Sequence, residues 1–107
     1  MNDKSIEQEI LDKGLTAPRV TLDQIDELCG SLFAKYERHG TSTFCHGFLD
    51  DKFYVASGHS ACVSPENFDE GLGRRIAFEN MVKTARDKLW ELEGYSLYKK
   101  MKEMENV

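Results

Sequence analysis

The chain has 107 residues, of which 40% are hydrophobic and 31% are charged, as is usual for one folded domain spanning 1–107. Its net charge of −5 comes without a dense basic surface, which argues against nucleic-acid binding. No apolar run approaches the roughly 20 residues that a membrane-spanning helix needs, and the first residues do not resemble a secretion signal. We therefore expect a cytoplasmic protein, with its three cysteines reduced.

Two helices are predicted in the N-terminal part of the chain. The first covers residues 6–13, with Ser5 as its N-cap. The second covers residues 21–38 and begins at the N-cap Thr21. Apolar residues within it recur at the spacing of one buried helix face, namely Ile25, Leu28, Cys29, Leu32, Phe33 and Tyr36.

Residues 42–61 change to the alternating pattern of an antiparallel β-hairpin. A turn centred on Asp50 and Asp51 sets the expected pairs Leu49–Lys52, Phe48–Phe53 and His46–Val55. One face of this hairpin would be rich in aromatic residues, namely Phe44, His46, Phe48, Phe53 and Val55. Because a lone hairpin is unstable in water, we expect this face to lie on helices or on another copy of the chain.

A long helix is predicted over residues 66–93, with Pro65 near its start. One side should be buried and carries Phe78, Met81, Val82, Ala85, Leu89 and Leu92. The opposite side carries Leu72, Ile76 and Trp90, which form the candidate interaction face. Gly94 should end or kink the helix before a frayed helical segment over 95–104. The predicted fold is α+β, with N-terminal helices, a central antiparallel hairpin and a long C-terminal helix packing on it.

Cys45, His46, His59 and Cys62 suggest a zinc site or cysteine catalysis, but their spacing favours neither. Structural zinc ligands usually come in pairs with two to five residues between them, whereas Cys45 and His46 are adjacent on a strand and point to opposite faces. No recognisable motif supplies an Asn or Asp to orient a catalytic histidine. We therefore expect no catalytic residue, metal or cofactor, and the sequence leaves open whether these four residues do more than pack.

The stretch from Ser60 to Asp69 joins the hairpin to the long helix and has two interpretations. The first is a structural corner, whose polar side chains satisfy backbone N–H groups. The second is a ligand-binding corner formed by Ser60, Asn67, Arg74 and Arg75. The start of a helix attracts anions, but the acidic residues there oppose one, so by default the arginines should pair with those acids.

Four stretches carry a resemblance to a known family, namely Gly14–Thr21, Gly58–Asp69, Gly73–Ala77 and Trp90–Tyr95. Through them the chain resembles the small bacteriophage and prophage protein family typified by the coliphage gene-49 (phage N-four) and gene-66 (phage Sf-six) products. Three features depart from that pattern: the Asp50–Lys52 turn, His59, and Glu91 in place of an expected proline. The resemblance supplies no catalytic residues.

The resemblance implies a phage-derived accessory protein in the cytoplasm of a bacterial host. The leading hypothesis is a non-enzymatic protein that binds a host protein and antagonises a host process or defence. One alternative is an oligomer that sequesters a small ligand or nucleotide signal, and another is a small enzyme. We expect a homo-oligomer, first of all a dimer, because Leu72, Ile76, Trp90 and the hairpin edge need cover. Neither a membrane nor a nucleic acid is expected as a partner.

Overall fold

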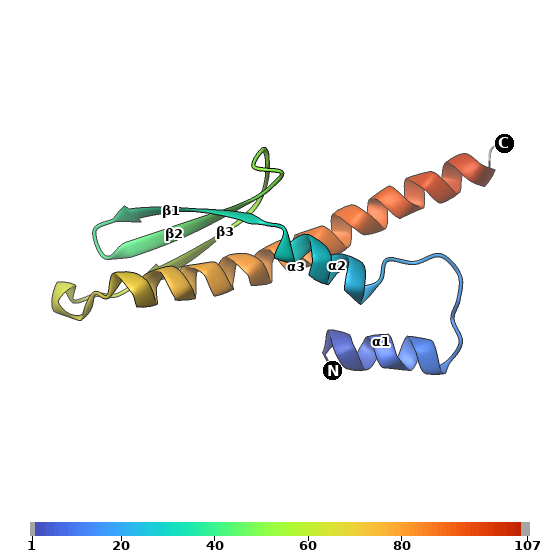
Figure 1. The fold of residues 1–107 in the computed structure, drawn as a ribbon, viewed down its shortest axis with the longest axis horizontal. Coiled ribbons are helices and arrows are strands. Elements are labelled where there is room, and N and C mark those ends of the chain that lie inside the picture. The colour runs from blue at the N-terminus through green and yellow to red at the C-terminus, as the bar shows by residue number, and fades with distance from the viewer. Residues whose placement is uncertain (1, 106–107) are drawn as a thin grey trace.

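The computed structural model describes residues 2–105. Its elements are α1 (Asp3–Asp12), α2 (Leu22–Gly30), β1 (Phe33–His39), β2 (Ser42–Leu49), β3 (Phe53–Ala61), the 3₁₀ helix η1 (Pro65–Asn67) and α3 (Glu70–Glu105). The strands form one antiparallel sheet in the order β1-β2-β3, and α3 packs across one face of it (Figure 1). The predicted α+β fold with a long C-terminal helix is confirmed.

The two N-terminal helices begin at capping residues. Asn2 caps α1 and accepts a hydrogen bond from the backbone N–H of Ser5 at 2.8 Å, so Ser5 is the third residue of the helix and not its cap. Thr21 caps α2 as predicted, accepting from the backbone N–H of Gln24 at 3.2 Å. No described residue of α1 is buried, whereas α2 contributes the fully buried Ile25 to the core.

The predicted helix over 21–38 is wrong beyond Gly30, because residues 33–39 form strand β1. This strand pairs with β2 from Phe33 opposite Phe48 to His39 opposite Ser42. Gly40 begins the two-residue turn between the strands with a φ of 60°, a left-handed conformation that favours glycine at the first position of a type II′ turn. A third strand thus completes the hairpin into a sheet.

The predicted register between β2 and β3 is also wrong. Leu49 lies opposite Phe53, because Asp50 and Asp51 both adopt left-handed φ angles in a three-residue turn. The register then shifts between Gly47 and Phe48. The resulting pairs include Phe48–Tyr54, Gly47–Ala56 and His46–Ser57.

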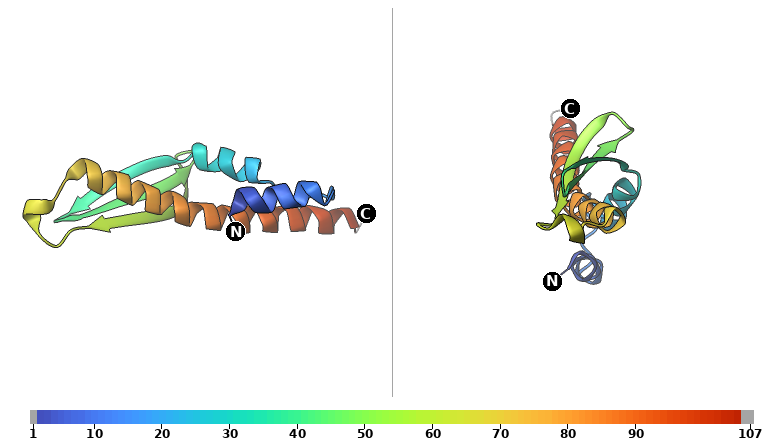
Figure 2. Two further views of the ribbon diagram at one scale, coloured as in Figure 1. Left: turned by 90° about the horizontal axis from the view of Figure 1, so that it is seen from below. Right: turned by 90° about the vertical axis from the view of Figure 1, so that its left-hand side faces the viewer.

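The face of the sheet that packs on α3 carries small side chains and not the phenylalanines. Its buried strand residues include Thr43, Cys45, Gly47, Ala56 and Gly58. The buried residues of α3 recur every fourth position at Ala77, Met81, Ala85 and Leu89. The helix lies so close to β3 that only small residues fit beneath it. The expectation that the aromatic-rich face lies on helices is therefore wrong, and no helix within residues 2–105 covers that outer face (Figures 1 and 2).

Helix α3 differs from the predicted helix over 66–93 at both ends. Pro65 opens the separate η1 turn, and the Asp69 carboxylate caps α3 by accepting from the backbone N–H of Leu72 at 2.8 Å. The helix then continues through Gly94, so this glycine does not end it and the segment 95–104 belongs to the same helix. A glycine in a helix interior costs only about 1 kcal/mol, which good helix formers on both sides can offset.

The buried side of α3 is narrower than predicted, since Phe78 and Leu92 are 40% and 39% exposed.

The whole molecule is elongated, with extents of 61 × 31 × 18 Å. The C-terminal part of α3 lies at one end, and the β1–β2 turn with η1 lies at the other (Figure 1).

Candidate functional site

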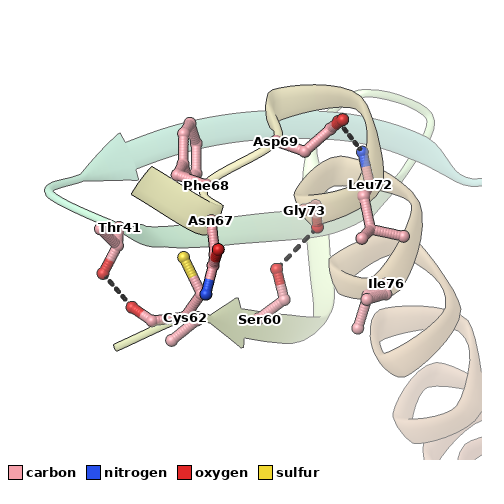
Figure 3. Close-up of a pocket in the computed structure, with 10 residues that line it drawn as sticks. Thr41, Ser60, Cys62, Asn67, Phe68, Asp69, Leu72, Gly73 and Ile76 are labelled. Atoms are coloured by element: carbon pink, nitrogen blue, oxygen red, sulfur yellow. Dashed lines mark hydrogen bonds between the residues drawn. The ribbon is translucent and has the colours of Figure 1, made fainter. Parts of the chain in front are cut away.

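An apolar pocket lies at the end of the molecule far from the termini, where β3 passes through η1 into α3 (Figure 3). Its volume is about 120 Å³. It is lined by Thr41, Ser60, Ala61, Cys62, Asn67, Phe68, Asp69, Leu72, Gly73 and Ile76. Residues from the sheet, η1 and the first turns of α3 thus meet around one small cavity.

Hydrogen bonds hold the walls of this pocket in place. The Ser60 hydroxyl donates to the carbonyl oxygen of Gly73 at 2.7 Å, which ties β3 to α3. Thr41 likewise donates to the carbonyl oxygen of Cys62 and ties the β1–β2 turn to the chain leaving β3 (Figure 3). These contacts support the interpretation of the corner as a structural joint. The pocket is the space that remains between the segments joined there.

The four residues of the predicted ligand corner do not converge. Ser60 and Asn67 both line the pocket. Arg74 instead pairs with Glu70 at 3.2 Å, and its guanidinium lies over the ring of Tyr36 at 5.1 Å. Arg75 is exposed and does not line the pocket. The structure therefore places two neutral polar side chains at the pocket and leaves the two arginines outside it.

The candidate face of Leu72, Ile76 and Trp90 divides into two parts. Leu72 and Ile76 line the pocket and are 44% and 38% exposed. Trp90 is half-buried and packs against the hydrophobic core. Val63, fully exposed, directly follows the pocket residue Cys62. The pocket end of the molecule therefore presents three exposed aliphatic side chains.

All three histidines of the chain gather around Phe44 on the outer face of the sheet. The centroid of the Phe44 ring lies 4.5 Å from that of His59, 6.1 Å from that of His39 and 6.3 Å from that of His46. The rings of Phe44 and His59 are nearly parallel, with an angle of 15° between their planes. This His–Phe cluster lies on the strand ends nearest the pocket.

A chain of hydrogen bonds crosses the same outer face from β1 to β3. Glu37 Oε1 lies 2.7 Å from His46 Nε2, and His46 Nδ1 lies 2.5 Å from Ser57 Oγ. Tyr54 Oη lies 2.8 Å from the same Ser57 oxygen. The hydrogen bonds from His46 and His39 lower the pKa of the Glu37 carboxyl group.

This arrangement has the carboxylate, imidazole and hydroxyl order of an activated serine. Its setting differs from that of a catalytic site in two respects. The Ser57 hydroxyl is shared with Tyr54, and the side chains of His46 and Glu37 are 29% and 50% exposed to water. Water at this exposure weakens electrostatic activation. We therefore interpret the group as a polar network that orients the surface side chains.

The cysteines and histidines singled out in the sequence are not brought together. Cys45 is fully buried beneath α3, while its neighbour His46 lies on the outer face. Burial raises the pKa of the Cys45 thiol. Cys62 instead lines the pocket. Among residues 2–105, no group of three or more His, Cys, Asp or Glu side chains is arranged to hold a metal ion.

Comparison with known families identifies the lineage of this chain. The family model described as "Phage protein (N4 Gp49/phage Sf6 gene 66) family" matches residues 4–101. The chain belongs to this phage protein family. No curated protein and no solved structure matched the chain. The resemblance seen in the sequence is thus confirmed over nearly the whole length.

The stretches that carried the family resemblance also build the pocket. Of its ten lining residues, eight come from them: Ser60, Ala61, Cys62, Asn67, Phe68, Asp69, Gly73 and Ile76. The pocket is therefore built mainly from the stretches that carried the resemblance.

In the described part of the chain, no helix has the length and apolar character needed to cross a membrane.

Sequence reasoning missed the polar network on the outer face. The predicted helix over 21–38 includes Glu37, and a helix cannot place this residue beside His46 and Ser57. The available signal was the pair Gly40–Thr41 between two alternating runs, which is typical of a two-residue hairpin turn. With β1 recognised, the register brings Glu37, Phe44 and His59 to one face.

Proposed function

We propose that this member of the phage family acts by protein binding in the infected bacterial cell, where it antagonises a host process or defence. The observation that supports this proposal is the apolar pocket with exposed aliphatic residues, Val63, Leu72 and Ile76, around it. Protein interfaces are typically anchored by a few side chains that fill such pockets. Sites for small molecules usually measure about 300–1,000 Å³, so a cavity of about 120 Å³ suits one apolar side chain of a partner better.

Affinity capture from a lysate of the bacterial host tests this proposal. The variant Leu72→Gln/Ile76→Gln removes the apolar rim of the pocket and keeps helix propensity. The matched control is Ile6→Gln/Leu11→Gln, which alters residues of α1 that are 41% and 60% exposed. We expect a host protein to be retained by the unaltered chain and by the control, and to be lost from the pocket variant. Equal retention by both variants, or no host protein retained by the unaltered chain, contradicts the proposal.

The second candidate function is an oligomeric protein that sequesters a small ligand or nucleotide signal. The stacked rings of Phe44 and His59 favour it, because planar bases stack on such rings and His59 is exposed. Mass spectrometry of denatured protein purified from cells would then reveal a co-purified molecule, and cyclic nucleotides would raise the melting temperature. A clean spectrum with no thermal shift argues against this candidate.

A further inference from the structure

The chain exposes more surface than a compact monomer of its size. Its radius of gyration is 17.8 Å, whereas a globular chain of this length has about 13 Å. Its accessible surface is 7751 Å², which is about 1,700 Å² more than expected for a monomer of 12.2 kDa. A standard protein interface buries about 800 Å² on each partner. The excess is therefore large enough to supply one such interface.

The C-terminal part of α3 extends beyond the sheet and adds to this surface (Figures 1 and 2). Leu89 is the last buried residue of the helix, which continues to Glu105. The 16 residues from 90 to 105 contribute no buried side chain, and Gly94 costs about 1 kcal/mol of helix stability relative to alanine. A partner helix would stabilise this segment, because most helical stability in proteins comes from packing of an apolar face.

The same segment carries an apolar seam with coiled-coil spacing. Five residues follow one another at intervals of four, three, four and three positions: Trp90, Gly94, Leu97, Met101 and Met104. A repeat that averages 3.5 residues keeps one side of a helix facing a partner helix. Met101 and Met104 are 42% and 75% exposed, and nothing lies within 4 Å of a Cβ placed on Gly94. Beyond Trp90, which is half-buried against the core, the seam is thus open in a single chain.

We propose that this C-terminal seam packs against the same seam of a second copy, in an antiparallel helix pair with its two-fold axis near Leu97. Antiparallel packing places Gly94 opposite Met101, so that a small and a large residue meet. It also brings Glu93 near Lys100 and Lys102 of the other copy. Parallel packing would instead place Gly94 against Gly94 and Met101 against Met101, and would leave Glu93 beside the uncharged Tyr98.

The antiparallel arrangement leaves the pocket ends of the two copies facing away from each other. It does not depend on the proposed function, because the seam and the pocket lie toward opposite ends of the molecule. The partner is a second copy of this chain because the seam is complementary to itself in shape and in charge.

Light scattering during size-exclusion chromatography at about 50 µM tests the pairing. We expect twice the 12.2 kDa mass of one chain. The variant Leu97→Gln/Met101→Gln should raise the dissociation constant at least about tenfold and give the monomer mass. The matched control Leu92→Gln/Tyr95→Gln removes exposed apolar residues outside the seam and should remain dimeric. Circular dichroism of both variants verifies that the fold is kept. A monomeric unaltered chain, or a dimer that survives the seam variant, overturns the proposal.

Disulfide trapping in a Cys29→Ser/Cys62→Ser background tests the direction of the pair. The variant Leu97→Cys places its thiol near the two-fold axis and should cross-link two copies. The variant Glu105→Cys should not, because a helix rises about 1.5 Å per residue and the two copies of that position would be about 24 Å apart. Cross-linking at position 105 would indicate parallel helices and overturn the antiparallel arrangement.

Discussion

Replacing Gly58 with alanine should separate α3 from the sheet. A Cβ at this position would lie 2.1 Å from the carbonyl oxygen of Ala77 and 2.2 Å from the backbone nitrogen of Met81. Both atoms belong to the helix backbone, so no side-chain rotation can relieve the contact. The helix must therefore move away from β3 by more than about 1 Å, in a region where interior packing is otherwise dense.

The expected loss of stability follows from this displacement. Overpacking of a well-filled core typically costs about 1–3 kcal/mol, and contacts with fixed backbone belong at the upper end of that range. For a domain of this size each kcal/mol lowers the melting temperature by about 4–8 °C, so Gly58→Ala should lower it by about 10–20 °C. Thermal and urea unfolding, followed by circular dichroism, measure the effect. Protein concentrations should be low enough to exclude association, because association alters apparent stability.

Two further glycine-to-alanine variants provide the controls. At Gly47 the nearest atom is the Sδ of Met81 at 2.5 Å, and this flexible side chain can move, so the loss should be smaller. At Gly94 the space is open, and alanine should raise the stability of the monomer by about 1 kcal/mol. If Gly58→Ala melts at the same temperature as the unaltered chain, the close packing of α3 on β3 is refuted.

Three further predictions concern the sheet and its side chains. Because the folded-state pKa of Glu37 is lowered, its stabilising effect is present above the ordinary value of 4.5 and is lost as the pH falls through the lowered pKa. The melting-temperature difference between the unaltered chain and Glu37→Gln should therefore shrink as the pH falls below about 4.5, and a constant difference would contradict this assignment. Cys45, fully buried and with a raised thiol pKa, should react with iodoacetamide at least about 100-fold more slowly in the folded protein than in urea, as mass spectrometry of its peptide can measure. Ser57→Ala should leave the hydrolysis of p-nitrophenyl acetate unchanged, whereas a loss of turnover would make the polar network catalytic.

The start of α2 and the helical nature of residues 70–93 could be predicted from local signals. Thr21 has the residue type and spacing of an N-cap, and the apolar pattern of α3 is periodic over many turns. The end of α2 could not be predicted in the same way, because Leu32, Phe33 and Tyr36 also fit a helical stripe. Pairing with β2 across the Gly40–Thr41 turn decides between the two structures, and the helical stripe does not reveal that pairing.

The choice of the buried sheet face could not be predicted from hydrophobicity alone. Phe44 and Phe48 are the larger apolar residues of β2, yet Cys45 and Gly47 face the helix. The reason is the close approach of α3, which leaves no room for large side chains beneath it. Gly58 is the residue that indicates this close approach. The sequence alone does not show that a helix lies against it, because the contact is with Ala77, nineteen positions later.

The candidate site could be predicted only in part, because it too depends on contacts between separate segments of the chain. The sequence predicts the corner from Ser60 to Asp69 and an interaction face that includes Leu72 and Ile76. Their arrangement around a pocket depends on the turn of the chain at η1. Arg74 does not meet Ser60, because neighbouring residues of a helix point in different directions. Gly73 accepts the hydrogen bond from Ser60, whereas the Arg74 side chain pairs with Glu70 outside the pocket.

Site-specific photo-cross-linking in the bacterial host tests the central claim most directly. A benzophenone amino acid placed at Leu72, on the rim of the pocket, should yield one discrete adduct with a host protein. The same group at Ile6, similarly exposed on α1, should not yield that adduct. No adduct from position 72, or the same adduct from both positions, would contradict the claim that this phage protein binds a host protein through its pocket end.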